Sequence, residues 1–111
     1  MNLLPNIDKI KIPAEKFTRY VLNYEKDYDK ALAFELALGY NMSNYKLLID
    51  NIHKSVSQYS ATPKGDAGFG MKYEVIMQMA GPNGKTAKVL TAWIDDVKLN
   101  EMRLTNAYID K

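Results

Sequence analysis

The spacing of apolar residues changes once along the chain, from a helical period in the first half to an alternating period in the second. Three helices are predicted in the first half, at about residues 14–23, at about 29–38, and from Ser43 or Asn44 to residue 58. The middle helix has almost no polar face, and a helix that is apolar all round is typical of a buried position. We therefore expect it to be central, with the other elements packed around it.

After residue 70, apolar side chains alternate with polar ones, which indicates half-buried antiparallel strands. Strands are expected at about 71–79, 86–95 and 102–109. The run Gly81-Pro82-Asn83-Gly84 combines the residues that favour a tight turn, so it predicts a hairpin between the first two strands. Residues 59–69 contain turn-forming residues without periodicity and are predicted to be a loop.

A run of helices followed by a run of strands predicts an α+β fold. The expected architecture is three N-terminal helices packed on one face of a three- to four-stranded antiparallel meander sheet, as a single domain over residues 1–111. The fourth strand would come from the alternating residues 10–12, for which an irregular lead-in is the alternative. The other face of the sheet would be open to solvent or to a partner.

Composition excludes several classes of function. The chain has no cysteine, which rules out disulfides and thiolate metal sites, and its N-terminus lacks the apolar segment of a signal peptide, so we expect a cytoplasmic protein without a membrane span. Its formal net charge of +2 is spread along the chain without a basic stripe. No ligand spacing for a metal and no phosphate or dinucleotide fingerprint is present, so no cofactor is expected.

Several short motifs follow one another along nearly the whole chain. They are Lys16, Phe17 and Tyr20; Lys30, Ala31, Phe34, Leu38, Gly39 and Tyr40; Gly81 to Gly84; Thr91 and Trp93; and Leu104, Thr105 and Tyr108. This ordered set resembles an uncharacterised bacterial domain family found at the C-terminus of polymorphic and contact-dependent growth-inhibition toxins. The resemblance implies an arrangement similar to the barnase/EndoU/colicin/RelE class of ribonuclease toxins, metal-independent cleavage of RNA such as tRNA, and an immunity protein as a partner.

Metal-independent RNA cleavage needs a base for the 2′-hydroxyl, an acid for the leaving oxygen and a cation for the phosphorane. The chain has one histidine, so a two-histidine pair is ruled out. Strand pairing could gather polar residues on one face of the sheet, although the register decides which of them meet. These candidate catalytic residues are Lys72 with Glu74, Thr91, Arg103, Thr105 and Tyr108. The alternative is an ordinary solvated sheet face.

Other residues are candidates for binding substrate. Lys16 and Lys30 could contact phosphate, or could be a surface lysine and a first-turn lysine whose stem lies on the core. Trp93 could stack on a base, although a core position is the commoner one for tryptophan. His53 could act as a general base or lie on the flank of its helix.

Two further functions are consistent with the sequence. The chain could be a non-catalytic interaction module of a phage or mobile element that binds a protein through the same sheet face, or a protein that inhibits another nucleic-acid enzyme, such as a bacterial defence nuclease. The small net charge favours the interaction module, because RNA-binding proteins usually concentrate positive charge. The sequence leaves open whether the protein is an enzyme, which RNA it would cut, and its oligomeric state.

Overall fold

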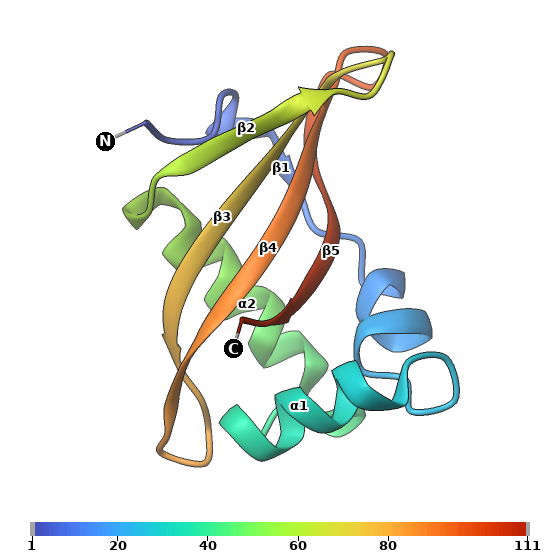
Figure 1. The fold of residues 1–111 in the computed structure, drawn as a ribbon, viewed down its shortest axis with the longest axis vertical. Coiled ribbons are helices and arrows are strands. Elements are labelled where there is room, and N and C mark those ends of the chain that lie inside the picture. Colours follow the sequence, from blue (N-terminus) through green and yellow to red (C-terminus); the bar gives the residue numbers. More distant parts are fainter. Residues whose placement is uncertain (1, 111) are drawn as a thin grey trace.

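The chain forms a twisted five-stranded sheet with two α-helices packed on one of its sides (Figure 1). The structure is a computed structural model and describes residues 2–110. The strands lie in the order β1-β5-β4-β3-β2. Their bounds are β1 Ile10–Lys11, β2 Ala61–Asp66, β3 Met71–Ala80, β4 Thr86–Asp96 and β5 Glu101–Ile109. The helices are α1, Tyr28–Leu38, and α2, Tyr45–Ser55.

The α+β class is confirmed, but the predicted arrangement needs three corrections. The sheet has five strands rather than three or four. The sheet is mixed, because β1 pairs with β5 in parallel while the other strands pair antiparallel. The helices are not all N-terminal to the strands, since β1 precedes them. The helix predicted at 14–23 is present but shorter, over residues 15–21, and most of it is π-helix, η2, at Phe17–Val21. Asn23 accounts for part of this, because its side chain bonds to the Thr18 carbonyl and to the Glu25 N–H.

The loop predicted at 59–69 is wrong, because most of it is strand β2. This strand pairs antiparallel with β3 and lies at the edge of the sheet, where a proline is tolerated. The register shifts between Pro63 and Gly65, and this irregularity hides the alternating pattern. Only Ala61 in this strand is buried, so hydrophobicity carried almost no signal there.

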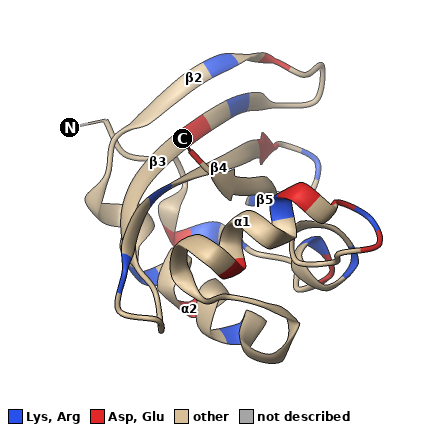
Figure 2. Cartoon of the chain, turned by 60° about the horizontal axis from the view of Figure 1, so that its bottom comes forward, with Lys and Arg blue, Asp and Glu red and all other residues tan. Residues whose placement is uncertain are grey.

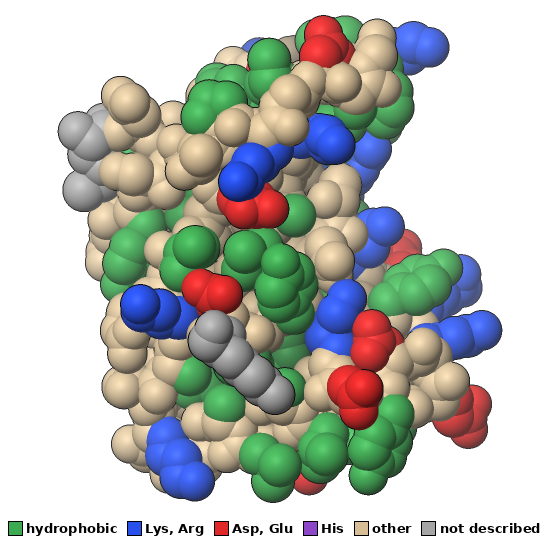
Figure 3. Space-filling view, in the orientation of Figure 1, with side chains coloured by type: hydrophobic (Ala, Val, Ile, Leu, Met, Phe, Trp, Pro, Cys, Tyr) green, Lys and Arg blue, Asp and Glu red, His purple; other side chains and the backbone are tan. Residues whose placement is uncertain are grey.

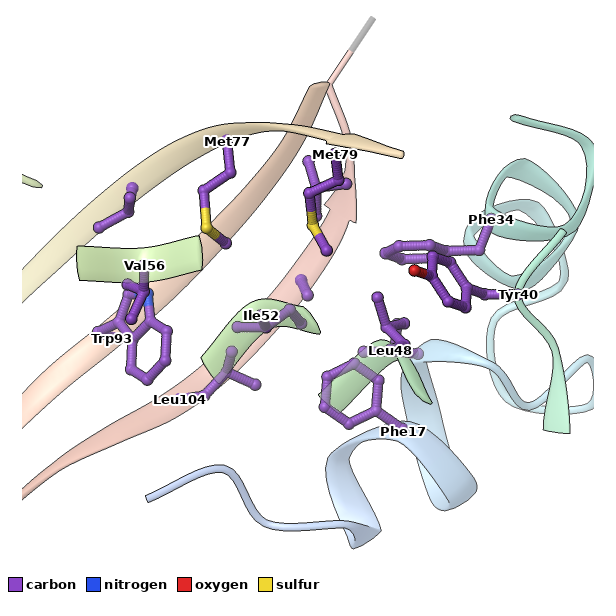
Figure 4. Packing of buried hydrophobic residues seen from close by; sticks show 14 of the residues in the cluster. Phe17, Phe34, Tyr40, Leu48, Ile52, Val56, Met77, Met79, Trp93 and Leu104 are labelled. Carbon is purple, nitrogen blue, oxygen red and sulfur yellow. The ribbon is translucent and has the colours of Figure 1, made fainter. Parts of the chain in front are cut away.

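The predicted stripe of the third helix is confirmed and forms part of one core with the sheet (Figure 4). Leu48 and Ile52 of α2, and Val56 of the short helical turn after it, are buried against the strands. The other large core side chains shown in Figure 4 are Phe17, Phe34, Tyr40, Met77, Met79, Trp93 and Leu104. The hairpin at Gly81 to Gly84 is also confirmed, with Gly84 at a φ of 84°.

Helix α1 has the predicted bounds to within a residue but not the predicted central position. It buries Ala31, Phe34 and Leu38, yet Tyr28 is 59% and Leu36 is 64% exposed. The helix lies against the ends of β4 and β5, as Figure 1 shows, so one side remains in solvent. Apolar residues on all sides of this helix therefore do not by themselves place it at the centre of the fold.

The edge of β5 positions the candidate site. Strand β1 covers β5 only at Met102 and Arg103, so the rest of that edge is left to α1 and η2. The pairing of β4 with β5 shifts between Ala92 and Trp93, which makes Thr105 the extra residue of a bulge. Bulges bend a strand and redirect its side chains, and this one lies directly beside the start of α1.

Candidate functional site

A groove runs along the uncovered edge of β5. It consists of two adjoining cavities of about 260 and 370 Å³, which share Asp27, Lys30 and Asn106 in their walls. The first is also lined by Lys16, Tyr20, Val21, Lys26 and Thr105, and the second by Asp29, Ala33, Tyr108 and Ile109. We call this feature the β5 groove. In Figure 2, basic and acidic positions lie together where the start of α1 meets β5.

Lys30 is the best-defined cation of the β5 groove. Its Nζ donates a hydrogen bond to Asn106 Oδ1 at 3.0 Å and lies 3.5 Å from Asp27 Oδ2. The same atom lies 5.7 Å from the centre of the Tyr108 ring, in the range of a cation–π contact. Only 22% of the Lys30 side chain is exposed. The ammonium group is therefore held in one place between α1 and β5.

Asp27 has a second role that explains why it sits beside Lys30. It is the N-cap of α1, and its Oδ1 accepts the Lys30 backbone N–H at 3.1 Å. An N-cap carboxylate satisfies a free helix N–H and is stabilised by the positive end of the helix dipole. The cap thus fixes a carboxylate next to the lysine three residues later.

The bulge in β5 places two polar residues in the groove wall. Thr105 Oγ1 donates to the Ala92 carbonyl at 3.2 Å, which ties the extra residue to β4. Asn106 Oδ1 accepts from the Ala107 N–H at 2.9 Å as well as from Lys30. Within residues 2–110, the Asn106 side-chain NH₂ has no hydrogen-bond partner, so it can donate to a ligand.

The opposite wall is the short turn η2. Its Phe17 and Val21 are buried and anchor the turn on the core. Lys16 Nζ lies 5.8 Å from the centre of the Tyr20 ring, and Tyr20 is 53% exposed. An exposed aromatic ring beside a cation is a surface on which a planar group can stack.

Tyr24 fixes the segment that carries Lys26 and Asp27. Its hydroxyl donates to Glu35 Oε1 at 2.9 Å. Its ring packs edge-on against the ring of Tyr28, with 5.4 Å between the two ring centres. Partial burial, and then the hydrogen bond to the Glu35 carboxylate, raise the pKa of Tyr24 above its ordinary value. The phenol therefore stays protonated and acts as a donor that ties this segment to α1.

The structure does not gather all of the predicted catalytic residues. Thr91 is fully buried, with its hydroxyl donating to the Val75 carbonyl at 2.9 Å and accepting from Trp93 Nε1 at 2.8 Å. Trp93 is only 1% exposed, so it occupies the core and cannot stack on a base without unfolding. Both residues belong to the packing of β4 rather than to a surface site.

Lys72 and Arg103 lie on the sheet face opposite the helices, separated by Ile94, which pairs with both. Glu74 lies 3.5 Å from Lys64 in an ion pair. Figure 3 views this outer face and shows hydrophobic side chains at its centre between the charged ones. The predicted polar cluster is thus divided among pairs that do not converge.

Arg103 is engaged in holding the β4–β5 turn. Its guanidinium lies 2.8 Å from Asp96 Oδ2 and 3.5 Å from Glu101. The hydrogen bond from the Leu99 N–H and then the one from Arg103 lower the pKa of Asp96, outweighing the opposite effect of desolvation. His53 is exposed on α2 and is not among the residues that line the groove.

Four of the predicted residues do converge: Lys16, Lys30, Thr105 and Tyr108 all line the β5 groove. Sequence reasoning missed Tyr20, Lys26, Asp27 and Asn106 as site residues. The three-residue spacing of Asp27 and Lys30 was an available signal, since a cap and a first-turn lysine must lie close together. No comparable signal exists for Asn106, because its position depends on the bulge.

Two absences apply to the part of the chain that the structure describes. Residues 2–110 contain no group of three or more His, Asp or Glu side chains placed to hold a metal ion. Over the same residues, no helix has both the length and the apolar character needed to cross a bilayer.

Comparison with known proteins gives a family but no described activity. No curated protein and no solved structure matches the chain. A family model matches residues 3–111, which is nearly the whole sequence. The description of that family names no toxin and no ribonuclease, so the resemblance to those proteins stays a prediction. On this match, the chain belongs to the family described as Domain of unknown function (DUF6883).

Proposed function

We propose that the β5 groove binds a single strand of RNA and cleaves it without a metal ion. The observation that carries this proposal is the convergence of Lys16, Lys26 and Lys30 with the rings of Tyr20 and Tyr108 on one groove. Lysines bind backbone phosphates, and exposed aromatic rings stack on bases whatever their sequence. The order of two helices followed by an antiparallel meander is compatible with the ribonuclease resemblance.

The groove contains groups suited to each part of the chemistry. Asp27 is the carboxylate that would take the proton of the ribose 2′-hydroxyl, whose oxygen then attacks the adjacent phosphorus. Lys30, 3.5 Å from Asp27, would stabilise the extra negative charge of the phosphorane. Lys16 lines the same cavity and would protonate the departing 5′-oxygen. The products are a 2′,3′-cyclic phosphate and a 5′-hydroxyl end.

Thr105, Asn106 and the two tyrosines would position the strand rather than react. The Asn106 NH₂ is a donor for a phosphate or base oxygen, and Tyr20 is exposed enough to accept a stacked base. The groove walls contain three lysines and two aspartates, so the positive charge is modest and local. Binding would therefore depend on stacking as well as on phosphate contacts.

The proposal is tested by incubating the purified protein with total bacterial RNA in EDTA and analysing the ends of the products. We expect discrete cleavage with 2′,3′-cyclic phosphate ends, lost in Asp27→Asn and Lys30→Ala. The matched control is Lys72→Ala, which removes an exposed lysine on the outer sheet face. Cleavage lost in the control and kept in both groove variants would move the site to the outer face and contradict the proposal.

The second candidate is a protein-interaction module without catalysis, such as an inhibitor of a bacterial defence nuclease. One observation favours it: Lys30 is already paired with Asp27 and bonded to Asn106, so the groove's central cation is satisfied within the chain. RNA that stays intact at every protein concentration would favour this function. Capture of a protein partner through the groove, an immunity protein included, would then be the next measurement.

A further inference from the structure

The two cavities of the β5 groove differ in charge. One lysine and one aspartate, Lys30 and Asp27, line both cavities and therefore contribute equally to each. The charged residues that line only one cavity are Lys16 and Lys26 in the first and Asp29 in the second. The first cavity thus has three lysines against one aspartate, whereas the second has one lysine against two aspartates.

The two lysines that line only the first cavity are available to a ligand. Within residues 2–110, neither Lys16 nor Lys26 forms a salt bridge. Glu25 is next to Lys26 in the chain but is not among the residues that line the cavity. Lys26 belongs to an ordered turn, since its N–H donates to the Asn23 carbonyl at 3.1 Å. A phosphate in this cavity would therefore meet two ammonium groups without breaking an ion pair.

The second cavity offers a phosphate no cation besides Lys30. Asp29 lies in the first turn of α1 and, over the described residues, forms no salt bridge. The other side chains that line this cavity alone are Ala33, Tyr108 and Ile109. Apolar and aromatic walls suit a base or a ribose, while an unpaired carboxylate repels a phosphate.

We propose that the β5 groove binds RNA in one direction, with the leaving nucleotide in the first cavity and the upstream nucleotide in the second. This inference rests on the proposed function, in which Lys30 stabilises the phosphorane and Lys16 protonates the departing 5′-oxygen. Because Lys16 lines only the first cavity, the leaving nucleoside lies there. The phosphate on its 3′ side then meets Lys26, whereas a phosphate on the 5′ side of the upstream nucleotide approaches Asp29.

The preferred substrate is therefore a strand that continues beyond the cleaved bond on its 3′ side. In a trinucleotide with hydroxyl ends, the first linkage has a phosphate on its 3′ side, and the second has one on its 5′ side. The first linkage should thus be the preferred one. Exposed charge pairs are worth little each, so we expect a preference of about threefold.

The first test measures binding and needs no cleavage. A uridine dinucleotide whose upstream 2′-hydroxyl is replaced by hydrogen is titrated into ¹⁵N-labelled protein, either with hydroxyl ends, with a 3′-phosphate or with a 5′-phosphate. We expect the 3′-phosphate to tighten binding by about threefold and the 5′-phosphate to give no gain. Lys26→Ala should abolish the gain and Lys26→Arg should retain it. The matched control, Lys54→Ala on the exposed side of α2, should behave as the wild type.

The second test is the ratio of products from a uridine trinucleotide in EDTA. Cleavage of the first linkage gives uridine 2′,3′-cyclic phosphate and a dinucleotide. Cleavage of the second gives uridine and a dinucleotide that ends in a cyclic phosphate. We expect the first pair in about threefold excess, and a smaller excess in Lys26→Ala. This ratio does not depend on the fraction of a variant that is folded.

The outcomes separate this inference from the RNA proposal itself. An equal or larger gain from the 5′-phosphate, a 3′-phosphate gain that persists in Lys26→Ala, or cleavage mainly at the second linkage would overturn the direction of binding and leave the RNA site in place. Binding with the expected phosphate preference but no cleavage would support the direction and contradict the catalysis. No shifts in the groove with any dinucleotide would overturn both.

Discussion

The Nζ atom of Lys30 donates a 3.0 Å hydrogen bond to the side-chain oxygen of Asn106, 76 residues later in the chain. This bond joins the first turn of α1 to the bulged edge of β5, where β1 no longer covers the strand. It also divides the groove into its two adjoining cavities, because both residues line each of them. The pair is therefore at the centre of the proposed RNA site.

Removing the Lys30 charge should weaken RNA binding and make the RNA affinity less dependent on salt concentration. For single strands, the slope of log affinity against log salt changes by about 0.7 for each phosphate that the protein neutralises. We expect Lys30→Ala to reduce the slope by about that amount in a fluorescence-anisotropy titration with a labelled oligonucleotide. Lys54→Ala, on the exposed side of α2, should leave it unchanged. Equal slopes for the wild type and Lys30→Ala would mean that Lys30 does not meet a phosphate.

Thr91 should matter for stability rather than for RNA. Thr91→Val removes the acceptor for Trp93 Nε1, so a buried N–H is left without its partner. A loss of about 1–3 kcal/mol in the free energy of unfolding is expected, measured by urea denaturation. Thr86→Val, at an exposed position of the same strand, should change it by less than about 0.5 kcal/mol. A catalytic role for Thr91 would instead appear as abolished cleavage at unchanged stability.

The close approach of α1 to the β3–β4 hairpin predicts a steric effect at Gly81. A methyl group there would overlap the carbonyl oxygen of Leu38, and backbone atoms cannot easily move aside. Gly81→Ala should therefore cost about 2–3 kcal/mol of stability. Gly84→Ala has open space around its methyl group and meets only the strain of its φ of 84°, about 1 kcal/mol. A lower urea midpoint for Gly84→Ala than for Gly81→Ala would contradict the close contact between Gly81 and Leu38.

Asp96 should make the protein more sensitive to acid. Its pKa is lowered in the folded state by the Leu99 N–H and by Arg103, so folding favours the ionised carboxylate. The stabilisation is present above the ordinary pKa of 3.8 and is lost as the pH falls through the lower folded-state value. Thermal unfolding from pH 6 to pH 3 should thus show a smaller loss for Asp96→Asn than for the wild type. Asp50→Asn, at an exposed position of α2, should retain the wild-type dependence.

Much of the fold was predictable because local signals and burial agree. Helix α1 begins after an Asp27 cap and ends at Gly39, whose φ of 83° only glycine adopts readily. The turn at Gly81 to Gly84 follows from its own residues. The apolar sequence of α1 misled in one respect, because the sheet covers only one of its sides and Leu36 stays exposed.

The candidate site was only partly predictable, since it depends on strand register. A single shift of strand register at the β5 bulge brings Thr105 and Asn106 to the groove, and no local sequence pattern predicts that shift. Thr91 was a candidate catalytic residue whose position was left to the strand register, and the register places it on the core face with Trp93. Strand β2 was missed because it is an edge strand with one buried residue, which leaves no alternation to detect.

The most direct test of the RNA proposal is to map where a short single-stranded RNA contacts the protein. In a titration of ¹⁵N-labelled protein followed by NMR, the account predicts shifts at Tyr20, Lys30, Asn106 and other residues of the β5 groove. The outer sheet face around Lys72 and Arg103 should remain unchanged. Shifts confined to that outer face, or no shifts at saturating RNA, would contradict the claim that the β5 groove is the RNA site.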